Sequence, residues 1–321
     1  MRQAGRSLPE YRAVRGEGSI LDAIKQPRLA ADITLQPVRR YGVDAAVLYS
    51  DIVVPAHAVG FGIDVTPGTG PVAQQPFRHT NDLSRLRPLE PESDTPYVIE
   101  TVRLLASELK IPLLAFAGAP FTVGSYLVEG RPSRDYLRTK ELMSSDATLW
   151  DALMRRLAEH AVASIRSQLD AGASAFQLFD SWAGALTVEQ YRTHVLEYSR
   201  YVFDELRASH PNVPGIHFGV GCDHLLEAMY AAGPRVIGLD WRSSITGARA
   251  RLGLNTIIQG NLNPELVLGE VDQALRGVDD VLADNAGHPG HIFNLGHGVH
   301  PSTNPDVLAA VVRYVHDQTK V

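Results

Sequence analysis

The 321-residue chain contains a single cysteine, Cys222. One thiol cannot form an intramolecular disulfide, and it cannot supply the thiolate cluster of a structural zinc site. The sequence therefore predicts neither a disulfide framework nor a bound metal. We expect a protein of a reducing compartment, the cytoplasm.

Long apolar runs and an excess of positive charge are also missing. No stretch is apolar for long enough to span a bilayer, and the basic start MRQAGRSLPEYRAVR has no apolar core of the signal-peptide type. The formal net charge is −6 at pH 7, whereas general nucleic-acid binding requires a dense cationic surface. We therefore expect no membrane and no nucleic-acid partner, and an anionic ligand would need a local basic cluster.

The glycine-rich phosphate loop GxGxxG, which open doubly wound sheets usually carry, is absent as well. The sequence does contain short apolar runs that alternate with helical patterns, which is typical of βαβ units with a parallel sheet. Seven strands are predicted, at residues 45–49, 112–117, 175–179, 215–218, 236–240, 256–259 and 291–295.

This alternation favours a (β/α)8 TIM barrel that occupies residues 1–321 as a single domain. An open sheet is the alternative, and the missing phosphate loop argues against it. Because only seven strands can be read, we expect the first barrel strand to be absent or distorted at the N-terminus.

Three local patterns supplement the strand prediction. Apolar residues at helical spacing predict a helix over 150–169, and Thr187 with Gln190 forms a capping-box pattern that opens another. The Pro- and Gly-rich segment 60–96 interrupts the alternation, and residues 63–76 alternate like a hairpin. This segment is either a wall of a pocket or a disordered surface loop.

Catalytic groups of such barrels come from the ends of the strands, so the residues that follow each predicted strand are candidates. Asp51 is either a helix N-cap or an anionic acceptor in an apolar pocket. His297, between two glycines, is either structural or directed into the site, and no carboxylate or cysteine joins it and His300 at metal-ligand spacing. The polar residues at these positions are Asp51, Asp180, Ser181, Asp240, Asn261 and His297.

Two further groups are candidates. Arg2 and Arg6, with Arg12 and Arg15 close behind, form either a clamp for a polycarboxylate or a solvated basic N-terminus. The Tyr126 ring either belongs to the core or offers its hydroxyl to a mainly apolar pocket.

Taken together, these motifs closely resemble the uroporphyrinogen decarboxylase family. Ser7 departs from the family pattern, because an aromatic residue usually stands there, and family members usually have a further segment ahead of this motif that contains the first barrel strand. The motifs that carry the resemblance are MRQAGR at 1–6 with LPEYR at 8–12, YSDI at 49–52, GAPFT at 118–122, YLVEG at 126–130, FDSWAG at 179–184, QGNL at 259–262 and NLGHG at 294–298.

The resemblance implies a carboxy-lyase that acts without metal or organic cofactor. Its substrate would be uroporphyrinogen III, a reduced tetrapyrrole with eight carboxylates. The four acetate side chains would become methyl groups, giving coproporphyrinogen III and CO2 in heme and porphyrin biosynthesis. The resemblance also implies a homodimer.

Residue roles follow from the same resemblance. Asp51 would accept hydrogen bonds from the pyrrole N–H groups and stabilise positive charge on the protonated ring. Tyr126 and Ser181 would hold carboxylates, and His297 would position a propionate or relay a proton. Substrate binding or protonation near the acetates would fall to the N-terminal segment Arg2, Gln3, Ala4, Gly5 and Arg6.

Two rival hypotheses are open at this point. A corrinoid-type methyltransferase shares the barrel but requires zinc-binding histidine and cysteine residues, for which the chain offers only His217 and Cys222. A non-catalytic tetrapyrrole carrier would use the same cleft without turnover.

Overall fold

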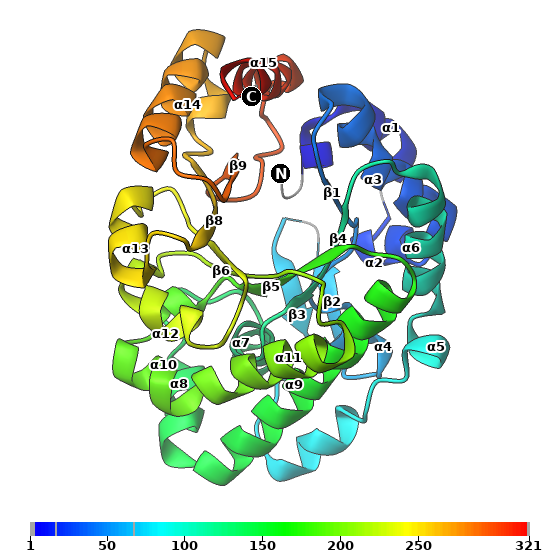
Figure 1. Cartoon of the computed structure of the whole chain (residues 1–321). Coiled ribbons are helices and arrows are strands. Elements are labelled where there is room, and N and C mark those ends of the chain that lie inside the picture. The colour runs from blue at the N-terminus through cyan, green and yellow to red at the C-terminus, as the bar shows by residue number, and fades with distance from the viewer. Residues whose placement is uncertain (1–3, 17, 67, 320–321) are drawn as a thin grey trace.

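A curved parallel sheet surrounded by helices forms the centre of the molecule (Figure 1). The structure, a computed structural model, describes residues 4–16, 18–66 and 68–319. All seven predicted strands are confirmed, with ends that shift by up to three residues. They are β1 (Ala46–Val47), β4 (Leu113–Gly118), β5 (Ala175–Asp180), β6 (Gly215–Gly219), β7 (Val236–Gly238), β8 (Ile257–Leu262) and β9 (His291–Leu295).

The sheet is open, which corrects the prediction of a closed eight-stranded barrel. Its strands follow the order β1-β4-β5-β6-β7-β8-β9, and every neighbouring pair is parallel. Within the described residues, β1 and β9 are the two edges and no eighth strand joins them. β1 is shorter than predicted, and it pairs with β4 alone. The expected loss of one strand therefore appears as a seam between β1 and β9.

Helix α15 (Pro305–Gln318) bridges this seam from outside and contacts α3 (Pro27–Tyr41). Arg40 pairs with Asp306 at 3.6 Å, and His316 Nε2 lies 2.9 Å from Asp44 Oδ2. Such exposed pairs contribute about 1 kcal/mol or less. A pocket of about 850 Å³ separates α15 from the sheet edges, lined mainly by apolar residues that include Val47, Leu114, Phe293, Val311 and Val315.

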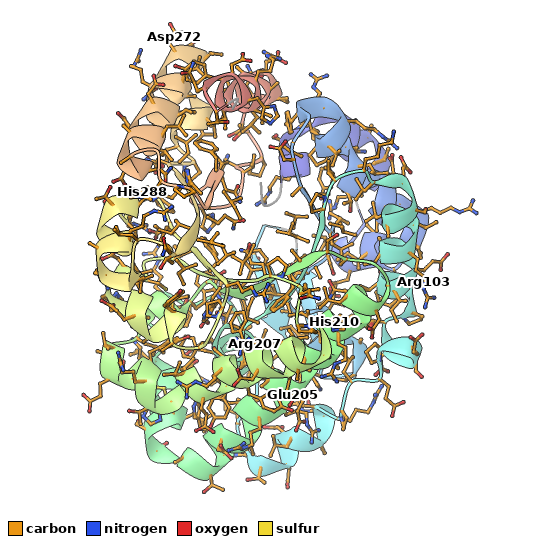
Figure 2. The ribbon with its side chains drawn as sticks, in the orientation of Figure 1. Arg103, Glu205, Arg207, His210, Asp272 and His288 are labelled. Atoms are coloured by element: carbon orange, nitrogen blue, oxygen red, sulfur yellow. The ribbon has the colours of Figure 1, made fainter. Side chains whose placement is uncertain are left out.

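The helices cover the outer face of the sheet, and charged side chains such as Arg103 and Asp272 project from them into solvent (Figures 1 and 2). In the described ranges no helix is both long enough and apolar enough to cross a membrane. Besides α3 and α15, the α-helices are α1 (Pro9–Arg15), α2 (Ile20–Ile24), α4 (Val54–Ala58), α5 (Pro91–Asp94), α6 (Pro96–Glu108), α7 (Pro120–Glu129), α8 (Leu137–Ser145), α9 (Ala147–Asp170), α10 (Val188–His194), α11 (Leu196–Ser209), α12 (Leu226–Tyr230), α13 (Ile245–Leu252) and α14 (Val271–Asn285).

Both helices that the sequence predicts are observed. The helix predicted over 150–169 is α9, which begins three residues earlier because Asp146 caps it by accepting from Leu149 N at 2.9 Å. Thr187 and Gln190 form the predicted capping box of α10, with reciprocal bonds of 3.0 and 3.1 Å. Short 3-10 turns complete the fold: η1 (Ala4–Ser7), η2 (Thr80–Arg85), η3 (Ala183–Ala185), η4 (Asp223–Leu225) and η5 (Leu266–Leu268).

The segment 60–96 is an ordered part of the fold, so the alternative of a disordered loop is wrong for its described residues. It contains the predicted hairpin, β2 (Ile63–Thr66) and β3 (Gly70–Ala73). Phe61, Phe77 and Leu86 are buried in a second apolar cluster that also includes residues of α7 and α9. The hairpin is thereby fixed against the helices that flank the sheet.

Replacing Phe77 by Ala tests this packing. Because the ring is fully buried, its loss should lower the free energy of unfolding by about 3–5 kcal/mol, as measured by urea denaturation. The control is Leu254→Ala, a side chain that is 63% exposed, with an expected change below about 0.5 kcal/mol. Equal midpoints for the two variants would show that the segment does not contribute to the core.

Candidate active site

A pocket of about 330 Å³ follows β1 to its carboxyl end and brings four predicted site residues together. Gly5, Arg6, Asp51 and Tyr126 all line it. Its walls come from η1, α1, α3, the β2–β3 hairpin and α7, and much of the lining is apolar. The apolar residues include Ile20, Val38, Val47, Ile52, Val65, Phe116 and Phe179.

Asp51 has a local structural contact and a place in the pocket wall. Its Oδ1 accepts a hydrogen bond from Val53 N at 3.0 Å, immediately before α4 begins at Val54. Asp51 thus binds a backbone N–H beside the start of α4, as the N-cap alternative expects, but the residue at the N-cap position itself is Val53. The half-buried carboxylate also faces the pocket. The turn thus fixes where this negative charge stands.

Arg6 places a cation at the same pocket from η1. Its side chain is largely exposed, yet partial desolvation lowers the pKa of Arg6 from its ordinary value. Tyr11 and Tyr49 line the same pocket, with their hydroxyl oxygens 3.4 Å apart. Burial raises the pKa of Tyr49, so the Tyr49 hydroxyl adds no negative charge to the pocket.

Tyr126 reaches the pocket from α7 and is held by aromatic neighbours. Its ring meets the Trp182 ring edge-on, with centroids 5.7 Å apart, and Tyr136 contacts the same indole at 5.7 Å. Only 8% of Tyr126 is exposed. It is therefore both a core residue and a residue of the pocket wall.

Trp182 is positioned by a set of buried, hydrogen-bonded residues. The sequence did not indicate this set. Thr122 Oγ1 donates to Asp180 Oδ1 at 2.9 Å, and Trp182 N donates to the same Thr122 oxygen at 3.2 Å. His217 Nε2 lies 3.6 Å from Asp180 Oδ2, and neither side chain is exposed. Thr122 falls within the GAPFT motif, but its link to a residue 58 positions away could not be read from spacing.

Ser181 and His297 also lie at carboxyl ends of strands, although neither lines the 330 Å³ pocket. Ser181 is 7% exposed, and its hydroxyl has no hydrogen-bond partner among the described residues. The His297 ring meets Trp241 edge-on, with centroids 6.1 Å apart. A Cβ at Gly296 would overlap Trp241 N, so glycine is required here for close backbone packing between two loops.

The remaining predicted residues belong to the N-terminal segment. Arg2 and Gln3 lie outside the described residues. Ala4 begins η1, and only its backbone position is described. The structure therefore places Gly5 and Arg6 of this segment in the pocket and leaves the proposed arginine pair untested.

No group of three or more His, Cys, Asp or Glu side chains in the described ranges is arranged to hold a metal ion. His217 is fully buried, and its Nδ1 lies 3.2 Å from Met229 O. Cys222 is also buried, and desolvation raises the pKa of its thiol well above the ordinary value. These two residues, which a methyltransferase hypothesis would use, have structural contacts here.

The fold and the site define an α/β protein related to TIM barrels, with polar and charged groups gathered at the carboxyl ends of its parallel strands. The family model described as "Uroporphyrinogen decarboxylase (URO-D)" matches residues 1–318. The chain belongs to the uroporphyrinogen decarboxylase family.

Curated relatives support this assignment along the whole chain. The uroporphyrinogen decarboxylase of Salinispora tropica is 52% identical over 320 residues, which cover 99% of this chain and 85% of the relative. Those of Streptomyces coelicolor and Mycolicibacterium vanbaalenii are 52% and 49% identical and are covered to 89% and 92% of their lengths. A solved methyltransferase from Methanosarcina mazei matches with a TM-score of 0.77 at 19% identity, covering 97% of this chain and 91% of its own, which shows a shared fold.

Substitutions at Thr122 test the buried group beside Trp182. Thr122→Val keeps the shape but removes both hydrogen bonds, and it should lower the free energy of unfolding by about 1–3 kcal/mol because Asp180 loses a buried donor. Thr122→Ser keeps the hydroxyl and loses one methyl group, at a cost of about 0.8 kcal/mol. Urea denaturation compares the two, and a valine variant at least as stable as the serine variant would contradict the assigned role.

Proposed function

We propose that this chain is a carboxy-lyase that decarboxylates uroporphyrinogen III, converting its four acetate side chains to methyl groups and yielding coproporphyrinogen III and CO2. The proposal rests mainly on family membership across residues 1–318, at about 50% identity to curated uroporphyrinogen decarboxylases. The pocket supports it by joining Arg6, Asp51 and Tyr126 within one largely apolar enclosure.

The chemistry of the reaction gives Asp51 its role. An acetate on a pyrrole can leave as CO2 only if the electrons of the broken C–C bond have an acceptor. Protonation of the ring carbon creates a cation that accepts them, which leaves an exocyclic methylene when CO2 departs. The methylene then takes up a proton and the ring carbon loses one, which gives the methyl group and restores the pyrrole. A carboxylate held in the apolar pocket stabilises that cation where charge develops, and it can accept hydrogen bonds from the pyrrole N–H groups.

The other site residues bind the carboxylates of the substrate. The N-terminal segment of Arg2, Gln3, Ala4, Gly5 and Arg6 binds the substrate near the acetates or supplies a proton there. Tyr126 and Ser181 donate hydrogen bonds from their hydroxyl groups to carboxylates. The buried Ser181 hydroxyl, which has no partner among the described residues, is suited to this role. His297 positions a propionate or relays a proton. No step in this scheme uses a metal ion or an organic cofactor.

We also propose that residues 1–321 form one domain that acts as a homodimer in the cytoplasm. The barrel core and the second apolar cluster share bridging side chains, among them Ile52, Val65, Leu142 and Trp182. A shared core of this kind favours joint folding of the two clusters.

The seam between β1 and β9 has the form of a site for an eighth parallel strand, which would complete the barrel. Both sheet edges border the apolar pocket of about 850 Å³, and Ile292 at the β9 edge is 43% exposed. Unpaired strand edges bind further strands readily.

The proposed reaction is tested by anaerobic incubation of the protein with uroporphyrinogen III. The products are oxidised, and their remaining carboxylates are counted by chromatography. Stepwise formation of porphyrins with fewer carboxylates, ending at four, is expected. Tight binding of the substrate without product would favour a tetrapyrrole carrier and overturn the proposal.

Replacing Asp51 by Asn tests the site itself. The amide oxygen can still accept from Val53 N, so the turn should persist while the stabilising charge is lost. We expect kcat to fall roughly a hundredfold or more, with binding of oxidised uroporphyrin changed by less than about threefold. Asp44→Asn, an exposed carboxylate before β1, is the charge-matched control. Equal kcat values for the two variants would remove Asp51 from the mechanism.

A further inference from the structure

A cation that the sequence did not single out stands at the carboxyl end of β7. Arg242 Nη1 donates to Asp240 Oδ2 at 2.7 Å, and Arg242 N donates to Asp240 Oδ1 at 3.0 Å. Asp240 Oδ2 also accepts from Gly221 N at 2.6 Å, in the loop that follows β6. The buried carboxylate is thus fixed by two loops, and it fixes the arginine in turn.

The Arg242 guanidinium is held in place but remains accessible. Its Cζ lies 3.9 Å from the centroid of the Trp241 ring, a stacked arrangement that restricts its rotation. Its side chain is nevertheless 53% exposed, whereas the Asp240 side chain is 1% exposed. A planar cation that is already oriented loses little conformational freedom when it binds a carboxylate.

Trp241 connects this arginine with a candidate site residue. One neighbour of the indole is Arg242, stacked on its face, and another is His297, whose ring meets it edge-on at 6.1 Å. The Gly296 backbone packs directly on the Asp240–Trp241 backbone, so the loops after β7 and β9 form one unit. Arg242 and His297 therefore lie on the same part of the carboxyl edge.

We propose that Arg242 binds a peripheral carboxylate of the tetrapyrrole, as a specificity residue on the β7 side of the site. The proposal rests on the proposed function, since that substrate carries eight carboxylates. Arg6 approaches from the β1 side, and β4, β5 and β6 stand between β1 and β7 in the sheet. The two cations would thus contact different edges of one macrocycle.

The electrostatics of the chain support this assignment. With a net charge of −6, the protein as a whole repels a polyanion, so binding depends on cations fixed at the site. Asp240 already accepts two backbone N–H bonds, which lessens its need for a counter-ion. The guanidinium uses Nη1 for Asp240, and its fork geometry suits a second carboxylate.

Arg242→Gln is the direct test, with uroporphyrinogen III as substrate and oxidised uroporphyrin as a ligand that does not turn over. We expect KM, and the Kd of uroporphyrin from fluorescence titration, to rise about tenfold or more, because a charge-assisted hydrogen bond is lost. The value of kcat should change by less than about threefold, since Arg242 does not act on the breaking bond.

The matched control is Arg155→Gln on the outer helix α9. Arg155 has the same kind of environment, because it pairs with Asp151 at 2.9 Å and lies 5.9 Å from the Tyr198 ring with 59% of its side chain exposed. Its replacement removes the same charge far from the strand ends and should leave KM and Kd unchanged. Equal KM and Kd for the two variants would overturn the role of Arg242.

Two outcomes separate this proposal from the proposed function. If the protein shows no turnover, the decarboxylase assignment fails, whereas uroporphyrin binding still tests Arg242. If Arg242→Gln does not fold, Arg242→Lys is compared with Arg155→Lys. The lysine keeps a charge near Asp240 but lacks the fork, so KM should rise about threefold or more in the first variant only. The absence of that difference would also refute the proposal.

Discussion

Close backbone packing between the loops at the carboxyl edge of the sheet is the constraint on which the site depends. A Cβ at Gly184 would overlap Val220 O, and a Cβ at Gly296 would overlap Trp241 N. Loops from β5 and β6, and from β9 and β7, thereby lie directly against each other. Because glycine alone permits this approach, the polar side chains on these loops are held in a fixed arrangement.

Two buried carboxylates use this packing in different ways. Asp180 binds Thr122 and lies near His217, and through Thr122 it fixes the backbone of Trp182 behind Tyr126. Asp240 accepts hydrogen bonds from Gly221 N and from Arg242, and it fixes the Arg242 guanidinium at the carboxyl end of β7. A buried carboxylate is stable only with such hydrogen bonds, so each one organises the groups around it. The first orders the wall of the pocket, and the second orders the Arg242 guanidinium at the carboxyl end of β7.

The open seam is the main irregularity of the fold. β1 and β9 are edge strands, and α15 bridges them through side chains and not through backbone pairing. Surface ion pairs contribute little, so the stability of this region depends on the apolar face of α15, where Val307, Leu308 and Val311 are buried. The pocket that Asp51 lines runs along β1, which is one edge of this seam. The position of β1 at the seam therefore also affects the wall of the pocket.

The sequence by itself determined the elements whose signals are local. The seven strands, the hairpin at 63–76 and the capping box at Thr187 and Gln190 were predicted because apolar periodicity and turn residues act over a few positions. Candidate residues after strands could be predicted for the same reason, since parallel strands end at one edge. The family motifs then associated those residues with a reaction.

Only the tertiary structure decided which of these residues meet. Thr122 and Asp180 are 58 positions apart, Trp241 and His297 come from different loops, and Arg6 joins Asp51 and Tyr126 across separate elements. The closed barrel was predicted wrongly for a related reason, because strand spacing does not reveal whether the first and last strands pair. Periodicity describes one element at a time, whereas contacts between distant elements depend on how the whole sheet curves and which side chains fill the space between them.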